Sequence, residues 1–438
     1  MDELEPLKVD RELRETARRV ERWTSELARG RGFDRDPFGG ERLGKTLFQA
    51  VRELPSADPL RPELLRWVFR LAEQRIDGAW LVREAQLEHQ SEHFVRAPVE
   101  GRFTLGAMTR AALSGVDAAE WHAARERSST ALGAHRAALW ERRQEVAVRM
   151  GLTHFFELEP LEPLARAEAR RVLDATREAA RELVRPGFAG CVEGALARSA
   201  NEGWPARLAP DALRALLGHE DWLRAVPLEP WTLPERLAPA SFARALFQLG
   251  RAWAVGLAPR DQPFVVARDA GALGALTLGA LFSGLTRQRR FLRKQLGLSD
   301  AQAREHARAL SLSHACWVRL AATRSLLVPA ALRGGAECSE RYVELVTELT
   351  AREPARETRL GLFRLHTNEA QRFGAWLLAA ARERELIEAY DEDWFRSPRA
   401  IEQLREETRL PPRKEASAEE LAEGRALFER ALHETLGR

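Results

Sequence analysis

Apolar residues recur every three or four positions along most of this 438-residue chain, whereas runs that alternate apolar and polar residues are almost absent. Isoleucine occurs three times and tyrosine twice, so two residue types that favour strands are scarce. A repeat of three to four residues is typical of an amphipathic helix that is buried along one face. The pattern therefore predicts an all-α protein with little or no sheet.

The same spacing predicts the extent of the individual helices. Glycine and proline interrupt the pattern between them, because both residues weaken a helix interior. Ser417 followed by Glu420 forms a capping box that marks the start of the last helix. The predicted helices cover residues 10–28, 61–95, 117–151, 162–184, 241–253, 267–285, 300–332, 337–351, 368–390, 398–407 and 416–436.

Proline-rich sequence over residues 204–239 interrupts the helical pattern and predicts a boundary between two lobes. A chain of this length can bury a large core, so we expect one large, two-lobed helical body. Its expected parts are an N-terminal helical extension (1–60), an N-terminal helical lobe (61–200), a second helical lobe (201–410), and a linker with the C-terminal helix (411–438).

The segment 241–253 is predicted to be the central helix of the second lobe. Its apolar residues form one continuous stripe, and the opposite stripe carries Arg244, Phe247, Gln248 and Arg251. A stripe of this composition faces either solvent in a cleft or an acidic partner group, because burying an unpaired guanidinium is costly.

The helix predicted over 267–285 contains four glycines. Each would weaken an exposed helix by about 1 kcal/mol, so they are expected where another backbone packs closely. We therefore place this helix in the middle of the molecule, with Gly271, Gly274 and Gly279 at close helix contacts.

The charge and composition of the chain require no particular class of partner. The 68 basic and 65 acidic residues leave a net charge of +3, which does not require a nucleic acid or a membrane as partner. The charged N-terminal sequence does not resemble a signal peptide, and the longest low-charge run, 270–285, is shorter than the roughly 20 residues of a membrane span. Three scattered cysteines also fit a reducing compartment, so a cytoplasmic location is expected.

Two short motifs suggest other chemistry. Gly39, Gly44, Lys45 and Thr46 match the P-loop pattern G-x-x-x-x-G-K-[ST], although the charged sequence before them does not predict the strand that a P-loop follows. The apolar run 263–269 ends in Asp, the weak candidate for a Mg²⁺-side carboxylate. A solvated loop that caps the next helix is the simpler interpretation.

Two further stretches suggest alternative functions, metal binding and nucleic-acid binding. His89, Glu92 and His93 match the H-x-x-E-H order of a metal-binding helix, within a charged segment where such matches arise easily. The run 286–294 gathers five basic residues around a phenylalanine, which suits phosphate contacts but is more typical of a solvated helix face. We therefore do not predict a nucleic-acid partner.

Several separated stretches together resemble the thimet oligopeptidase and oligoendopeptidase F class of zinc peptidases, particularly bacterial members. ALFQLGRAWA takes the place of the zinc-binding sequence L-H-E-x-G-H-A, and TLGALFSGL resembles T-E-G-x-A-x-x-x-E. The resemblance implies a two-lobed zincin-like fold with a degenerate peptidase lobe over residues 201–410. The stretches that carry it are 85–121, 141–158, 245–254, 277–285 and 390–406.

The sequence departs from that class at the residues that would bind zinc and act as the general base. In a zincin helix two His bind the metal and a Glu is the general base. Here the positions that the resemblance assigns to the three ligands are Phe247, Arg251 and Leu278, and the base position is Gln248. The chain before the central helix also lacks the strand pair that lines the cleft and pairs with substrate in such peptidases, and the segment 362–376, which contains His366, lacks the expected tyrosines.

These losses predict a protein without zinc, cofactor or catalytic residues, that is, a pseudoenzyme. The leading hypothesis is a catalytically inactive peptidase-like protein that binds a protein or peptide partner as a regulatory or heteromeric subunit, with a homologous active peptidase as one candidate partner. Arg244, Gln248, Arg251 and His366 are its candidate binding residues. The alternatives are a structural helical protein with a filled cleft and an enzyme of unrelated chemistry.

Overall fold

The computed structural model describes most of the chain. The described residues are 5–38, 43–96, 99–113, 133–154, 157–159, 161–178, 203–205, 208–209, 213, 233–333, 335–350 and 365–436.

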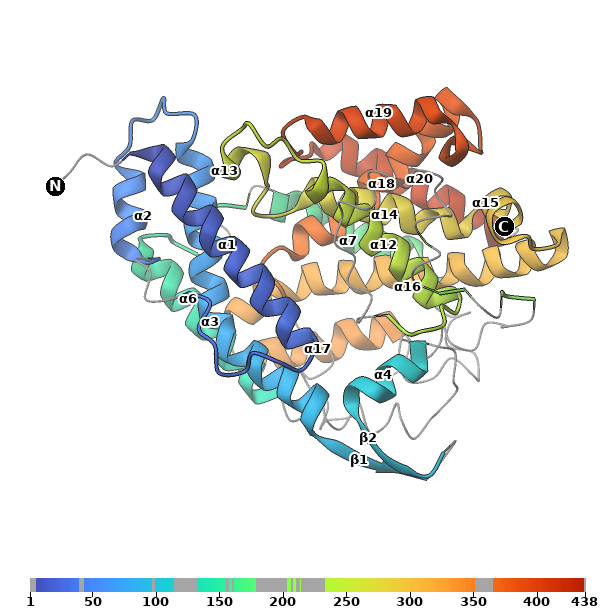
Figure 1. The fold of residues 1–438 in the computed structure, drawn as a ribbon, viewed down its shortest axis with the longest axis horizontal. Coiled ribbons are helices and arrows are strands. Elements are labelled where there is room, and N and C mark those ends of the chain that lie inside the picture. The colour runs from blue at the N-terminus through green and yellow to red at the C-terminus, as the bar shows by residue number, and fades with distance from the viewer. Residues whose placement is uncertain are drawn as a thin grey trace.

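Helices dominate the described residues, and the predicted all-α class is confirmed (Figure 1). The first half contains α1 (Pro6–Ala28), α2 (Lys45–Arg52), α3 (Arg61–Gln90), α4 (Leu105–Leu113), α6 (Gly133–Met150) and α7 (Leu161–Ala175). The second half contains α12 (Pro239–Gly256), α13 (Phe264–Ala267), α14 (Leu273–Gly284), α15 (Arg289–Leu296), α16 (Asp300–Arg333), α17 (Gly335–Thr350), α18 (Glu369–Tyr390), α19 (Pro398–Arg409) and α20 (Ala418–Leu436), with short 3₁₀ turns at Leu285–Arg287 and Trp394–Arg396.

The N-terminal helices form one flank of the molecule, and the C-terminal helices α18, α19 and α20 form another (Figure 1). Between them lie α12 and α14, and α14 packs against both α12 and α18. The central placement predicted for the helices over 241–253 and 267–285 is therefore confirmed. On the first flank, buried Asp10 of α1 accepts the backbone N–H groups of Phe264 and Val265 at 3.0 and 2.8 Å, which holds the start of α13 against α1.

One hydrophobic cluster runs through the described residues from Val9 on α1 to Leu432 on α20. All four parts expected from the sequence contribute to it. Within this cluster α16 is long and apolar enough to cross a membrane by length and composition, but 67% of the tested window is buried inside the protein. That burial is typical of the core helix of a soluble protein.

The capping box predicted at the last helix is present. The Ser417 N–H donates to Oε2 of Glu420 at 2.8 Å, and the Glu420 N–H donates to Oγ of Ser417 at 3.2 Å. The two bonds satisfy amides that would otherwise lack partners at the start of α20.

The helix predicted over 61–95 is too long at its C-terminal end. Residues Glu92–Val95 form strand β1, which pairs antiparallel with β2 (Gly101–Thr104). A short strand pair that the sequence pattern did not predict is therefore present before the central helix. The chain turns because Ser91 adopts an extended backbone after Gln90, and the strands are too short for a clear alternating pattern.

The helix predicted over 267–285 is also interrupted at its start. Phe264–Ala267 forms α13, and α14 begins at Leu273 after a loop in which Ala272 has a left-handed φ of 62°. Asp269 organises this loop by accepting the N–H groups of Gly271 and Leu273 at 2.9 and 2.8 Å. A side-chain cap of this kind competes with helix propensity, which is why the apolar run did not reveal the break.

Candidate functional site

Two glycines allow α12 and α14 to cross with their backbones in contact. A Cβ atom on Gly250 would lie 2.3 Å from the carbonyl oxygen of Leu278. A Cβ atom on Gly279 would lie 2.8 Å from the carbonyl oxygen of Phe247 and 2.9 Å from Cγ of Arg251. Glycine alone avoids both clashes, and the crossing gathers the three positions that the peptidase resemblance assigns to metal ligands.

The glycine prediction is confirmed at Gly279 and needs correction elsewhere. Gly271 precedes α14 and meets the side chain of Gln371 rather than a helix backbone. Gly274 faces the linker before α20, 3.4 Å from the backbone nitrogen of Arg413. Two of the four glycines in this run thus serve the turn and the linker, while α12 supplies the second glycine of the crossing.

Phe247 is half-buried, and its ring packs on Trp376 of α18 with the two centroids 5.4 Å apart. An aromatic pair therefore occupies the place that the resemblance assigns to the first metal ligand. Neither ring offers a lone pair to a cation, so this part of the site is built for packing.

A cavity of about 660 Å³ opens beside the crossing. Its lining residues come from α1, α3, α12, α13, α14, α18, α19 and α20, and from the loops beside these helices. Of the six residues singled out from the sequence, Arg251 and Leu278 line it, and Arg251 is exposed there. A volume of this size lies within the range of roughly 300–1,000 Å³ typical of small-ligand pockets.

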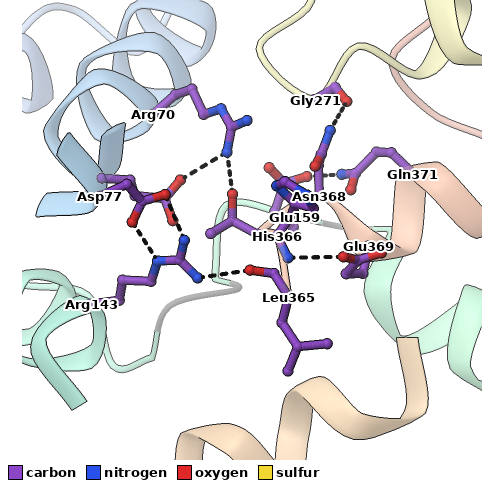
Figure 2. Close-up of polar contacts among 12 residues, drawn as sticks. Arg70, Asp77, Arg143, Glu159, Gly271, Leu365, His366, Asn368, Glu369 and Gln371 are labelled. Atoms are coloured by element: carbon purple, nitrogen blue, oxygen red, sulfur yellow. Dashed lines mark hydrogen bonds and ion pairs between the residues drawn. The ribbon is translucent and has the colours of Figure 1, made fainter. Parts of the chain in front are cut away.

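The other sequence candidates lie beside the cavity without lining it. Arg244 and Gln248 are half-buried on α12. His366 is also half-buried, and its backbone N–H donates to Oε1 of Glu369 at 2.8 Å (Figure 2). The structure therefore brings Arg251 to the cavity and separates it from the rest of the predicted binding face.

Arg372 on α18 is a cavity residue that sequence reasoning missed. Its Nε donates to Oδ1 of Asn368 at 3.1 Å, and the Asn368 amide donates to the Gly271 carbonyl oxygen at 3.0 Å. Figure 2 shows this last bond between the start of α18 and the loop before α14. The spacing of Asn368 and Arg372 places both on one face of a helix, which is the signal that the sequence offered.

Burial lowers the pKa of Arg372 to about 10, and Glu369 opposes that shift. A guanidinium with this pKa remains charged at neutral pH. The neighbouring positive charges that lower the pKa further belong to Arg251, Arg324 and Arg70. Like charges repel one another, so placing these arginines near one another costs electrostatic free energy.

Arg70 on α3 is the third cationic cavity residue. Its Nη1 contacts the hydroxyl of Thr367 and lies 3.4 Å from Oε2 of Glu73. Burial raises the pKa of Glu73 to about 8, against the opposing effect of Arg70, and Oε1 of Glu73 has no hydrogen-bond partner among the described groups. Glu73 is then mostly protonated at neutral pH, so it leaves the charge of Arg70 largely uncompensated.

A buried ion pair behind Arg70 makes this wall of the cavity rigid. Nε and Nη2 of Arg143 donate to the two carboxylate oxygens of Asp77 at 3.1 and 2.6 Å, and Nη1 donates to the Leu365 carbonyl oxygen at 3.3 Å (Figure 2). The guanidinium also lies 4.6 Å from the ring centroid of Trp140. These contacts fix α3 and α6 to the segment before α18.

Two carboxyl groups near the loop before α14 are protonated more readily than usual. Burial raises the pKa of Glu159 to about 7, with a further contribution from the negative charge of Asp269, and the side chain contacts the amide of Gln371. Burial also raises the pKa of Asp269, although two backbone N–H bonds oppose the shift. Since Asp269 is occupied as a loop cap, the candidate Mg²⁺-side role has no support from this geometry.

The far side of the cavity is acidic. Glu385, Glu407, Glu420 and Glu423 line it, together with two arginines that are already paired. Arg382 contacts Glu385 at 2.5 Å and also Glu407, and Arg413 contacts Glu420. The cavity therefore has a cationic side and an acidic side.

Other chemistry suggested by the sequence finds no matching geometry in the described part of the chain. No group of three His, Cys, Asp or Glu side chains there could hold a metal ion. His89 lies on α3 whereas Glu92 and His93 lie on β1, so the H-x-x-E-H match does not occupy one helix.

The P-loop match is only partly described, because Gly39 lies outside the described residues. Gly44 is the N-cap of α2, and Lys45 and Thr46 are its first two residues, with exposed side chains. The segment before them, 29–38, is a loop after α1, and the run 263–269 contains helix α13 instead of a strand. A P-loop joins a buried strand to a helix, so the context that nucleotide binding requires is not met.

No protein-family model matches this chain, and a search of curated proteins gives no match either.

Proposed function

We propose that this protein is a non-catalytic, peptidase-like binding protein that receives a segment of a protein or peptide partner in the cavity beside Arg251 and Leu278. The observation that carries the proposal is an open cavity of about 660 Å³ next to positions that offer no metal ligand and no general base. A cleft can keep its capacity to bind after its chemistry is lost, because binding and catalysis need different groups.

Exposed apolar residues at the cavity support the same proposal. Val255 and Leu410 are 38% and 62% exposed, and both line the cavity, Val255 from α12 and Leu410 from the segment after α19. Large apolar side chains exposed at the edge of a concavity are typical of binding sites. We further propose that the partner is met in the cytoplasm, with a homologous active peptidase as one candidate, so that the protein acts as a regulatory or heteromeric subunit.

Absence of catalysis is tested on the purified protein. We expect elemental analysis to find no stoichiometric zinc and a quenched-peptide mixture to remain uncleaved, since Phe247, Arg251 and Leu278 supply no ligand. One tightly bound zinc per chain, lost on Gln248→Ala or Arg251→Ala, would contradict the proposal.

Binding is tested by filling the cavity. Ala254 lines it from α12 and is half-buried, so Ala254→Trp should occupy the space without entering the core. We expect this variant to keep its helical circular dichroism and to lose retention of short peptides on the immobilised protein. Val148→Trp, at an exposed position of α6 that does not line the cavity, is the matched control and should retain peptides normally.

A structural protein with a filled cleft is the second candidate, and the packing of Phe247 on Trp376 favours it locally. Under that hypothesis Ala254→Trp and Val148→Trp would behave alike, and neither would change any interaction. An enzyme of unrelated chemistry would instead show turnover that Ala254→Trp abolishes.

A further inference from the structure

The segment between α19 and α20, residues 410–416, forms part of the cavity wall, and we call it the strap. Four of its residues line the cavity: Leu410, Pro411, Pro412 and Arg413. Leu410 has an extended backbone, with φ of −78° and ψ of 160°, and each proline ring holds φ at about −65°. The strap is therefore stretched out where it passes the cavity.

The far part of the strap is attached to α3 by two ion pairs. Nζ of Lys414 lies 3.0 Å from Oε2 of Glu63, and Nη2 of Arg66 lies 3.1 Å from Oε1 of Glu415. Helix α3 itself lines the cavity through Trp67. The strap thus connects two helices, α19 and α3, that both line the cavity.

Few other contacts hold the strap in this position. Within the described part of the chain, no backbone hydrogen bond joins residues 411–416 to another element. Below the strap is Gly274 of α14, where even an added Cβ atom would lie 3.4 Å from the backbone nitrogen of Arg413. Ala416 packs on the core, whereas Leu410 is exposed. A segment with so few buried apolar side chains and backbone bonds opens at a low cost in free energy.

The two ends of the strap are better defined than its middle. The Leu410 N–H donates to the Glu407 carbonyl oxygen at 3.2 Å, which closes the last turn of α19. The capping box of Ser417 and Glu420 fixes the start of α20, and Arg413 also contacts Glu420. Since prolines stiffen the part between these ends, the strap can lift away from α3 as a unit.

Resting on the proposed binding function, we infer that the strap limits entry to the cavity and that its two ion pairs with α3 hold it closed. Salt screens ion pairs at the surface, and Glu415 is exposed, so high ionic strength favours the open position. The apparent affinity of a ligand falls with the fraction of molecules that are open to it. Release of the strap therefore tightens binding, and a segment of the protein itself regulates the site.

The test measures binding of N-phenyl-1-naphthylamine, a neutral apolar dye, to the full-length protein by fluorescence titration. Lys414→Gln combined with Glu415→Gln removes both ion pairs to α3 and changes no residue that lines the cavity. We expect this strap variant to bind the dye about 3- to 10-fold more tightly than the parent protein. Arg384→Gln combined with Glu388→Gln is the matched control and should bind like the parent, because it removes an exposed ion pair of α18 that does not line the cavity.

Two further measurements connect dye binding to the strap. Hydrogen exchange at the amides of residues 413–416, followed by mass spectrometry, should be faster in the strap variant than in the parent protein and the control. Raising potassium chloride from about 0.05 M to about 0.5 M should tighten dye binding in the parent protein and the control, and much less in the strap variant, whose ion pairs are already absent. Any effect of salt on the dye itself is common to all three proteins.

The outcomes separate this inference from the proposed function. Faster exchange with unchanged or weaker dye binding in the strap variant would show that the strap moves without limiting entry, and would overturn the inference. Unchanged exchange would overturn it too, because the ion pairs would not be what holds the strap. Tighter binding that persists when Ala254→Trp is added would place the dye outside the cavity, with the same consequence. Tighter binding that Ala254→Trp abolishes, in a protein that retains no peptides, would support the strap and overturn peptide binding. Absence of dye binding in every variant, and of peptide retention, would overturn both.

Discussion

Two groups of basic residues in this protein have different surroundings. On α15, Arg290 lies 3.2 Å from Glu392, and Arg293 lies 3.2 Å from Asp300, while Lys294 contacts Asp393. At the cavity, the charges that lower the pKa of Arg372 belong to other arginines, and Glu369 is the acid that opposes them. The first group is paired with acids of the protein, whereas other cations contribute most of the charge effects on the pKa of Arg372.

This difference shows that a high density of basic residues along the sequence does not by itself indicate a binding site. The run 286–294 is strongly basic, yet Arg290, Arg293 and Lys294 form surface ion pairs that each contribute at most about 1 kcal/mol. At the cavity, Arg70 on α3 and Arg251 on α12 are more than 180 positions apart in sequence, and they come close together only in the folded protein. The pairing on α15 also weakens the nucleic-acid alternative, because paired cations are less available to phosphates.

The largest expected effect comes from breaking the crossing that positions Arg251. Gly250→Ala should destabilise the protein by about 3 kcal/mol, because its Cβ would meet a backbone carbonyl that cannot move aside. Thermal and urea unfolding measure the loss. Gly44→Ala is the control: no atom lies within 4 Å of a Cβ atom there, so a change below about 0.5 kcal/mol is expected.

Equal unfolding midpoints for Gly250→Ala and Gly44→Ala would show that α12 and α14 do not cross as described. The comparison would then lose its structural basis, since Arg251 would no longer be held beside Arg372.

Hydrophobic periodicity was enough to predict the helical class and most helix bounds, because a continuous apolar stripe leaves a repeat in the sequence. It failed at Ser91 and at the loop around Asp269, where side-chain and backbone capping decide the local structure. The capping box at Ser417 was predictable because both of its partners lie within four residues.

The candidate site was only partly predictable for a related reason. Arg251 was found because its helix and stripe were evident from the spacing. Nothing in α3 distinguishes Arg70 from the other arginines of that helix, because its role depends on α18 packing nearby. The burial that sets the pKa of Glu73 is likewise a property of the folded protein.

The next expected effect concerns pH and tests why the cavity keeps its positive charge. The pKa of Glu73 rises from its ordinary value of 4.5 to about 8 on folding. Its contribution to stability is therefore fully present below pH 4.5 and is lost as the pH rises through about 8. Glu73→Gln, which stays neutral, should remove this loss and raise the stability at pH 9 relative to the parent protein by on the order of 2 kcal/mol.

Urea unfolding at pH 5 and pH 9 measures this difference. Glu145→Gln, at an exposed position of α6, should leave the pH dependence unchanged. A parent protein whose stability rises between pH 5 and pH 9, with no effect of Glu73→Gln, would mean that Glu73 is ionised at neutral pH and compensates Arg70.

The smallest expected effect distinguishes the two groups of arginines directly. Citrate, a compact polycarboxylate, should bind the cavity arginines and stabilise the folded protein by on the order of 1 kcal/mol at about ten times its dissociation constant. The melting temperature should rise in citrate relative to sodium chloride of equal ionic strength, which screens surface charges alike. Arg251→Gln should reduce this rise, because it removes one of the three cavity cations. Arg290→Gln should preserve the rise, since Arg290 is already paired with Glu392, although it lowers the melting temperature slightly in both salts. Equal reductions in the two variants would mean that citrate acts on the general surface, and the distinction between cavity arginines and surface arginines would fail.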